Sequence, residues 1–286
     1  MRARFFPSLA LLVSLLAQPA LSQPKPPAGK PPGKPATVPV PTAPAIDAKA
    51  LLEKIKSGEP PRVAEGLAAA QAGGGAAAAV APAIEELLKK GTTLALAKSG
   101  LAALGAIGAV SSSAVIRPYL RHRNADLRRA AVLALSNTKG AEAHAAYREG
   151  LRNEDATVRG ASAMGLGNLG ATDALGDLFL ALDRNVPEAA AAIGRLCAPA
   201  DCDKLVGKLG QVPFVVLSTG FDAILFRQKP LPEDLLLRIV ERVRQLKTAE
   251  AAKYLSDVAS RWPAAGSRRV KQALDGEVAS TTGAAK

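Results

Sequence analysis

The feature that most restricts the fold of this chain is a repeat with a period of 31 residues. A shift of that length brings Leu104, Leu135 and Leu166 into register. It also superposes several small and apolar residues: Gly105 on Ser136 and Gly167, and Ile107 on Thr138 and Leu169. A unit this short cannot bury its own apolar face, so successive copies must stack on one another. A further unit follows at a shorter step, where Ile193 and Gly194 align with Leu166 and Gly167.

Apolar spacing within one unit predicts two α-helices. In NEDATVRGASAMGLGNLG, one apolar stripe with steps of three and four residues comprises Val158, Ala161, Gly165 and Leu169, with Met164 beside it. This is the spacing of one helix face. After a turn at Gly170, Thr172 is expected to cap a second helix. Its apolar face comprises Leu175, Leu178, Phe179 and Leu182. Each unit is therefore predicted to be a helical hairpin.

The composition supports an all-α fold. Hydrophobic residues make up 48% of the 286 residues but aromatic residues only 3%, so alanine and leucine supply most of the apolar surface. Stacked helices that meet through small side chains need few large rings. The predicted fold is an α-solenoid, a superhelix of antiparallel helix pairs.

The string GLGNLG at residues 165 to 170 matches the spacing of a dinucleotide-binding loop. That loop requires a strand before it and a helix that begins at its last glycine. Neither is expected here, because the string lies at the end of a predicted helix and in register with LGAIG at 104 to 108. We interpret Gly165 and Gly167 as sites of close helix approach, and Gly170 as a helix-ending residue with left-handed backbone.

These repeats resemble the HEAT-like repeat named after the phycobilisome lyases. The matching residues in one unit are Asp155, Val158, Arg159, Ala161, Ala163, Leu166 and Gly167. The preceding unit matches at Leu127, Arg128, Ala130 and Leu135, but has Asn124 in place of the Asp, and the following unit has Glu188 in place of the Arg. The resemblance covers roughly residues 60–210 and implies HEAT-like antiparallel helix pairs without indicating a function. It further implies that Arg128 and Arg159 belong to an internal ladder with acidic residues such as Asp126 and Asp155.

Four segments are expected along the chain. Residues 1–22 are typical of a cleaved signal peptide, with two arginines before a short apolar run and small residues before Gln23. That run is shorter than the ~20 residues that span a bilayer, so no transmembrane span is expected after cleavage. Residues 23–45 carry nine prolines and form a disordered tether, or a ligand for a proline-binding groove. The solenoid occupies 46–275, and a disordered tail 276–286.

Helices are also expected on both sides of the clear repeats. The first unit covers 46–72 with Asp47 as its cap, the AGGGAAAA stretch forms a flexible turn, and a helix follows over 81–90. After Gln211 the sequence predicts four further helices, over 212–226, 232–246, 248–262 and 267–276.

Cys197 and Cys202 are the only cysteines. In an oxidising compartment they are expected to form a structural disulfide. Their spacing is not the CxxC of redox proteins, and no histidine lies near enough in sequence to complete a zinc site. His122 and His144 lack the neighbours of a triad or a metal site. The sequence therefore predicts no catalytic residue, no metal and no cofactor.

Arginines gather in one part of the repeat region. The predicted basic strip comprises Arg117, Arg121, Arg123, Arg128, Arg129 and, one repeat later, Arg159. Guanidinium groups in such a strip bind carboxylates or phosphates, and the alternative is a solvated surface without a ligand. The formal net charge of +12 favours acidic partners. Export and the scarcity of aromatic side chains argue against nucleic acid.

The resulting hypothesis is a periplasmic or secreted, non-catalytic HEAT-repeat scaffold. Its partner would be a protein or an anionic polymer of the cell envelope, bound along the curved face. Two alternatives remain open: a lyase-like enzyme accessory or cofactor-attachment chaperone, and a purely structural assembly factor.

Overall fold

The computed structural model describes residues 47–283, and the side chains of that range up to residue 276. The predicted signal peptide, 1–22, and tether, 23–45, lie outside the described residues. In the described part all regular elements are helices, apart from one isolated bridge between Leu209 and Val212. The prediction of an all-α fold is confirmed.

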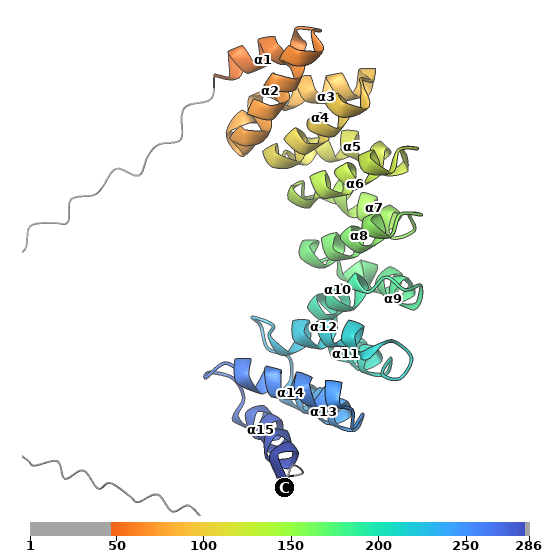
Figure 1. The fold of residues 1–286 in the computed structure, drawn as a ribbon, viewed down its shortest axis with the longest axis vertical. Coiled ribbons are helices and arrows are strands. Elements are labelled where there is room, and N and C mark those ends of the chain that lie inside the picture. The colour runs from red at the N-terminus through yellow and green to blue at the C-terminus, as the bar shows by residue number, and fades with distance from the viewer. Residues whose placement is uncertain (1–46, 284–286) are drawn as a thin grey trace, which may run out of the picture. The chain divides into compact units, whose positions relative to one another are not determined.

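The helices form two layers within this part of the chain (Figure 1). The even layer consists of α2 (Pro60–Gly73), α4 (Leu94–Ile107), α6 (Ala125–Ala134), α8 (Ala156–Leu169), α10 (Glu188–Leu196), α12 (Phe214–Leu225) and α14 (Ala249–Arg261). The odd layer consists of α1 (Ala48–Lys56), α3 (Ala81–Lys90), α5 (Ser113–Ile116), α7 (Ala141–Gly150), α9 (Leu175–Asp183), α11 (Pro199–Val206) and α13 (Glu233–Arg244). The last helix, α15 (Arg268–Gly283), packs against α13 and α14.

Each even helix packs on the next even helix, from α2 to α14, and on the odd-layer element that precedes it in the chain. For α6 that element is the 3-10 helix η3 (Arg117–Arg121), which continues α5. This stacking of helix pairs is the arrangement of an α-solenoid, as predicted.

The pairing within a unit differs from the prediction. The sequence analysis paired α8 with α9, whereas α8 packs on α7 and α10, and α9 packs on α10. The turn at Gly170 therefore carries the chain to the next unit, and the hairpin turn lies between α7 and α8.

Short polar residues begin the repeat helices. The Asn124 side chain accepts hydrogen bonds from the backbone of α6, and Asp155, at the equivalent position of the next repeat, does the same for α8. Asp47 caps α1 as predicted. The prediction for Thr172 is wrong, because it lies in the 3-10 turn η5 (Thr172–Ala174) and makes no side-chain cap. Gly170 ends α8 with a φ of 72°, the left-handed backbone predicted for it.

Two other boundaries differ from the sequence prediction. The AGGGAAAA stretch is mostly the 3-10 helix η1 (Gly74–Val80), in which Ala77 and Val80 are buried, and so it is not an open turn. The helix α15 continues to Gly283, past residue 276, where the predicted disordered tail begins. In the described residues, one continuous helical run, Pro60–Lys90, has the length and hydropathy of a membrane span. It consists of α2, η1 and α3, and Leu67, Ala70 and Ile84 are buried in the core.

Small residues set the distance between even-layer helices. A Cβ atom at Gly105 would lie 2.7 Å from Cα of Ala134, and one at Gly167 would lie 3.0 Å from Cα of Ala192. Gly194 contacts the backbone of Gly220 in the same way. The predicted role of Gly165 and Gly167 is confirmed, because a Cβ at Gly165 would also overlap the ring of Tyr147.

A matched pair of alanine substitutions tests this packing. A Cβ at Gly194 would lie 2.9 Å from Cβ of Ala223 and closer still to the carbonyl oxygen of Gly220, whereas one at Gly176 in α9 would meet nothing within 4 Å. We expect Gly194→Ala to lower the free energy of unfolding by about 1–3 kcal/mol. Gly176→Ala should raise it by up to about 1 kcal/mol, because alanine favours a helix. Urea denaturation measures both, and equal effects would contradict this account.

Candidate binding surfaces on the two helix layers

The odd layer carries a ladder of ion pairs between neighbouring repeats. Arg117, in η3, donates to Glu142 at 3.1 Å and to Glu149 at 3.3 Å, both in α7. Arg121 also binds Glu149. These contacts hold the Arg117 side chain against the next repeat and raise the pKa of its guanidinium, through hydrogen bonds from it to Glu142 and Glu149.

The same arrangement recurs in the next repeat. Arg148 donates to Asp177 at 2.8 Å and lies 3.6 Å from Asp173. Arg152 reaches Asp177 at 3.5 Å, and His144 lies 3.2 Å from Asp173. Further along, Lys208 pairs with Asp183, and Arg238 pairs with Asp203 through both carboxylate oxygens. The ladder therefore links successive odd-layer elements from η3 to α13.

Two arginines of the predicted strip hold the loops of their own repeats. Arg128 donates to the carbonyl oxygens of His122 and Arg123, which precede α6. Arg159 donates to the carbonyls at the same two positions before α8, those of Asn153 and Glu154. Because Arg128 is buried and its hydrogen bonds satisfy backbone acceptors, we assign both side chains a structural role.

The ladder implied by the family resemblance has different partners. Arg128 pairs with Glu154 at 2.8 Å, not with Asp126 or Asp155. Asp155 is instead bound by Arg129, whose Nε lies 2.8 Å from its Oδ2. Of the six predicted strip residues, only Arg123 is exposed and has no ion pair or hydrogen bond from its side chain within the described range.

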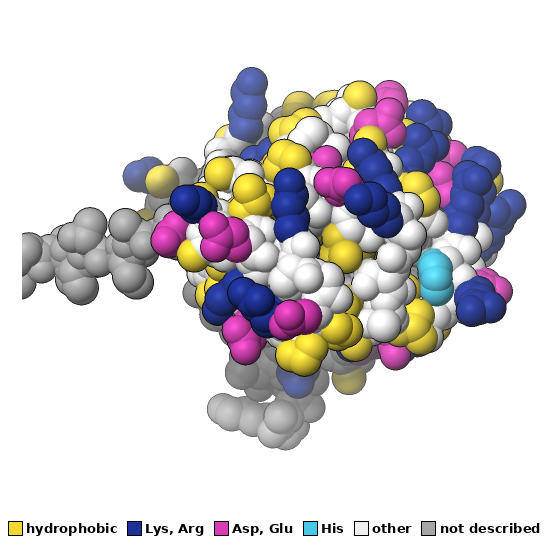
Figure 2. All heavy atoms as spheres, turned by 90° about the horizontal axis from the view of Figure 1, so that it is seen from above, with side chains coloured by type: hydrophobic (Ala, Val, Ile, Leu, Met, Phe, Trp, Pro, Cys, Tyr) yellow, Lys and Arg dark blue, Asp and Glu magenta, His cyan; other side chains and the backbone are white. Residues whose placement is uncertain are grey.

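The surface seen from the end at which α1 lies shows both dark blue and magenta side chains (Figure 2). On the odd layer, Arg117, Arg121, Arg148 and Arg152 form ion pairs with carboxylates of the adjacent repeat. The strip of Arg117, Arg121, Arg123, Arg128, Arg129 and Arg159 is not brought together as one free surface. Whether any of these residues binds a partner stays a prediction.

A polar hollow of about 590 Å³ lies along this ladder. Its lining comes from η3, α7 with the residues that follow it, and α9: Arg121, Arg148, Glu149, Arg152, Asn153 and Asp177. The carboxylates are recessed, since the Glu149 and Asp177 side chains are 20% and 16% exposed. The Arg121 and Arg152 side chains are 75% and 72% exposed and form the rim.

The even layer presents an apolar surface at equivalent positions of two repeats. Leu133 in α6 and Met164 in α8 lie one repeat apart and are 64% and 46% exposed. Leu133 lines two hollows, one of about 410 Å³ between α4 and α6 and one of about 130 Å³ between α6 and α8. Met164 lies beside Ala161, Gly165 and Leu169, as the predicted stripe places it, but its side chain is exposed to solvent.

The residues around Leu133 are mostly small. Ala102, Ala106 and Ala130 line the larger hollow together with Lys98 and Arg129. Ala161, Met164 and Leu169 line the smaller one together with Lys139. We call Leu133, Met164 and the two hollows the even-layer surface. Short side chains there leave room for a partner to approach the helices closely.

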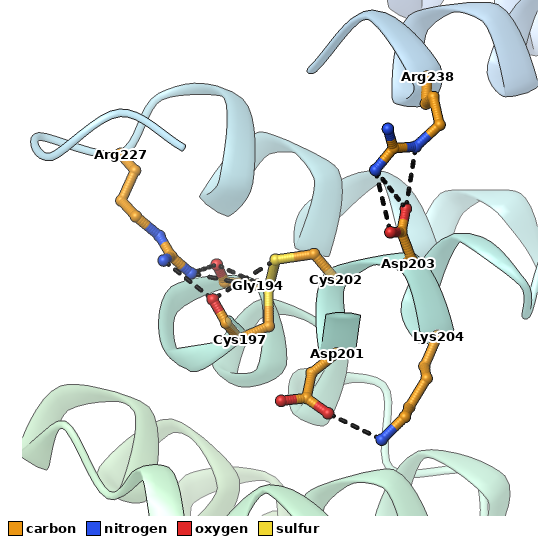
Figure 3. Close-up of a disulfide and its surroundings, with 8 residues drawn as sticks. All are labelled: Gly194, Cys197, Asp201, Cys202, Asp203, Lys204, Arg227 and Arg238. Atoms are coloured by element: carbon orange, nitrogen blue, oxygen red, sulfur yellow. Dashed lines mark hydrogen bonds and ion pairs between the residues drawn. A yellow bond between two sulfur atoms is a disulfide. The ribbon is translucent and has the colours of Figure 1, made fainter. Parts of the chain in front are cut away.

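Cys197 and Cys202 are at disulfide-bonding distance, with their sulfurs 2.03 Å apart (Figure 3). The pair joins the end of α10 to α11, and both residues are buried. Arg227, which follows α12, donates to the carbonyls of Gly194 and Cys197 at 2.6 and 3.1 Å. Desolvation by burial lowers the pKa of the Arg227 guanidinium. The disulfide joins the end of α10 to α11, and the Arg227 guanidinium joins it to the residues after α12. Together they hold the end of α10 in place, as expected for a structural disulfide.

The two histidines lie in different surroundings. His122 stacks on Tyr119, and its Nδ1 accepts a hydrogen bond from the backbone of Asn124. His144 lies in the ladder beside Asp173. No group of three or more His, Cys, Asp or Glu side chains within the described range is arranged to hold a metal.

The sequence analysis named Arg121 and Met164 but missed other residues that shape the two surfaces, among them Arg148, Arg152, Asp177 and Leu133. Shifting Arg117 and Arg121 by one repeat gives Arg148 and Arg152, and shifting Glu142 gives Asp173. The repeat could therefore have revealed a ladder instead of a strip. The same shift aligns Ala102, Leu133 and Met164, but nothing in that alignment tells which apolar residues face solvent.

Comparison with known families identifies HEAT repeats in residues 113–196, which confirms the predicted repeat type for that stretch. No curated protein matches the chain. One similar solved structure is the complex of CpcE and CpcF of phycocyanin lyase from Nostoc sp. PCC7120, with 18% identity, a TM-score of 0.45 and coverage of 86% of this chain and 100% of that chain. An engineered protein has 19% identity, a TM-score of 0.47 and coverage of 80% and 71%.

A homology model of the full-length AP-3 complex in an intermediate open conformation has a TM-score of 0.51. Its identity is 15%, and the match covers 81% of this chain and 50% of that chain. At this level of identity the likeness shows a shared solenoid fold alone.

Acid titration tests the interaction between repeats at Asp155. Burial opposes ionisation of this carboxyl, but hydrogen bonds from Thr157 N–H and the Arg129 guanidinium outweigh it and lower its pKa. A lowered pKa stabilises the fold above the unfolded pKa of ~3.9, and that contribution is lost as the pH falls through the folded pKa. Asp155→Asn keeps a capping oxygen, as Asn124 does in the preceding repeat, and removes the charge.

We expect Asp155→Asn to lower the free energy of unfolding by about 1 kcal/mol at pH 7. The difference from the wild type should shrink as the pH is lowered from 7 to below about 3.9, towards the lowered pKa of the folded wild-type carboxyl. Urea denaturation across this pH range measures it. A difference that stays constant with pH would exclude a role for the Asp155 charge.

The disulfide can be tested by removal and by reduction. Cys197→Ala with Cys202→Ala should lower the free energy of unfolding by roughly 2 kcal/mol, the chain-entropy value for so short a loop. Because both sulfurs are buried, reductant without denaturant should leave the bridge intact, as monitored by thiol alkylation and mass spectrometry. Rapid reduction in the folded protein would show that the bridge is accessible.

Proposed function

We propose that this chain is an exported, non-catalytic HEAT-repeat scaffold that binds a protein partner on the even-layer surface. One observation carries the proposal: Leu133 and Met164 project into solvent at equivalent positions of adjacent repeats, beside hollows of about 410 and 130 Å³. HEAT repeats in residues 113–196 agree with a binding role, since stacked repeats present extended surfaces to partners.

The physical basis is the cost of leaving these side chains in water. Burying a leucine or methionine side chain contributes roughly 1.5–3 kcal/mol. A few fully desolvated side chains near the centre of a contact carry most of the energy of an interface. The alanines of the two hollows, among them Ala102 and Ala130, would form the surroundings of the anchors. An apolar contact of this kind favours a protein partner over an anionic envelope polymer.

Export belongs to the same proposal. Residues 1–22 have the pattern of a secretory signal peptide. The pair Cys197 and Cys202 suits an oxidising compartment, where disulfides persist. The proposed location is therefore the periplasm or the medium, with the proline-rich segment 23–45 as a spacer between the signal peptide and the repeats.

Site-specific cross-linking in the intact envelope tests the proposed surface. A photoreactive residue at position 133 or 164 should capture a protein, and one at Leu94 or Val110 should capture far less, although these two are exposed apolar residues as well. With the captured partner purified, Leu133→Glu with Met164→Glu should weaken binding at least tenfold, equivalent to about 1.4 kcal/mol.

The matched control is Leu94→Glu with Val110→Glu, which adds the same charge to exposed positions outside the surface. Circular dichroism checks that each variant folds. Equal capture at all four positions, or equal loss of affinity in the control, would refute the assignment. A purified protein that carries a pigment would instead favour the lyase-like accessory.

A further inference from the structure

We infer that the polar hollow on the odd layer is a second binding site, which takes a carboxylate of an acidic peptide segment between the guanidinium groups of Arg121 and Arg152. This site is separate from the even-layer surface. It rests on the proposed function only in taking a protein as the partner.

The first reason is that one arginine of the ladder is incompletely paired. Glu149 is bound by both Arg117 and Arg121. Asp177 binds Arg148 closely, with Nη2 to Oδ2 at 2.6 Å, but meets Arg152 only at 3.5 Å. The Asp177 side chain has one methylene fewer than that of Glu149. Because its carboxylate lies close to Arg148, it does not also reach Arg152 well. Among the described residues Asp177 is the only carboxylate that contacts Arg152, so most of its five N–H donors are left for solvent or a ligand.

The second reason is that the positive groups of the hollow lie nearer to solvent than the negative ones. The Glu149 and Asp177 carboxylates lie at the floor of the hollow, and the Arg121 and Arg152 guanidiniums lie at its rim. The lining contains three arginines and two carboxylates, so its formal charge is positive by one. Because the positive groups are the more exposed ones, an approaching anion meets them first.

The third reason is the chemical match to a carboxylate. Guanidinium groups bind carboxylates through two parallel N–H donors, and most steps of the ladder are already Arg–carboxylate pairs. A single negative charge balances the formal charge of the lining. The Asn153 side chain is committed to the carbonyl of Leu120 at 2.8 Å, so it holds the wall in place and is not available to a ligand. A side-chain carboxylate from a partner would add one more member to the ladder.

The test uses a fluorescein-labelled, glutamate-rich peptide and its glutamine counterpart, with binding followed by anisotropy at low salt. Arg121→Gln with Arg152→Gln should weaken binding of the acidic peptide by about threefold to tenfold. Arg242→Gln with Lys253→Gln removes the same charge from exposed side chains that have no ion pair in the described part, and should change affinity less than about twofold. The glutamine peptide should not bind.

A charge-neutral variant separates a defined site from general attraction. Asp177→Glu lengthens the internal carboxylate by one methylene, so it can satisfy Arg152 and should weaken the acidic peptide without changing net charge. An unchanged or tighter complex with this variant would overturn the proposal, as would equal weakening by the two double variants. Displacement of the peptide by polyphosphate at far lower concentration than by free polyglutamate would overturn the assignment to a carboxylate.

The two binding proposals can fail separately. Leu133→Glu with Met164→Glu should leave peptide binding at the odd-layer hollow within about twofold of wild type, because those residues lie on the other layer. If cross-linking at 133 and 164 captures nothing, the peptide experiment still decides the odd-layer site.

Discussion

The close approach of neighbouring even-layer helices is the interaction on which the rest of the structure depends. Gly105 lies against Ala134, Gly167 against Ala192, and Gly194 against the backbone of Gly220. Because these positions lack bulk, each helix can lie on the next with the leucines beside the contact fully buried. Leu104 and Leu166 precede two of these glycines and are inaccessible to solvent. A larger side chain at any of these contacts would push two repeats apart. The odd-layer helices that pack on those repeats would move apart as well.

Ion pairs connect neighbouring repeats in addition to these close contacts. Arg129 reaches Asp155 in the even layer, and a longer series of pairs joins the odd-layer elements. The Arg117 and Arg148 bridges span from one repeat to the next. Most of these pairs are solvent-exposed, so each contributes little free energy. Their effect is to set the relative position of adjacent repeats and to recess the carboxylates beneath the arginines.

Much of the fold could be predicted because it repeats. The 31-residue period of three successive stretches predicts stacked helices, Asp47 has the side chain of a helix cap, and Gly170 can adopt the left-handed backbone that ends a helix. The pairing of α8 with α7 could not be predicted from that stretch alone, since both neighbouring helices present apolar residues to it. The binding surfaces were harder still. The arginine cluster was visible, but its neutralisation depends on carboxylates of the following repeat that only stacking brings close.

Leu133 and Met164 show why an apolar pattern alone does not locate a binding surface. A helix stacked between two others in a layer and one in the facing layer buries most of its circumference, so apolar residues are expected all around it. In α6 the buried residues Leu127, Ala131 and Ala134 share one face and Val132 lies on another, and Leu133 directly precedes Ala134. Only the position of the neighbouring helices shows that this one leucine faces solvent. The same stacking that buries the core therefore leaves a row of equivalent positions exposed. The residue at this position is Ala102 in one repeat, Leu133 in the next and Met164 in the third, so each repeat presents a different side chain to a partner.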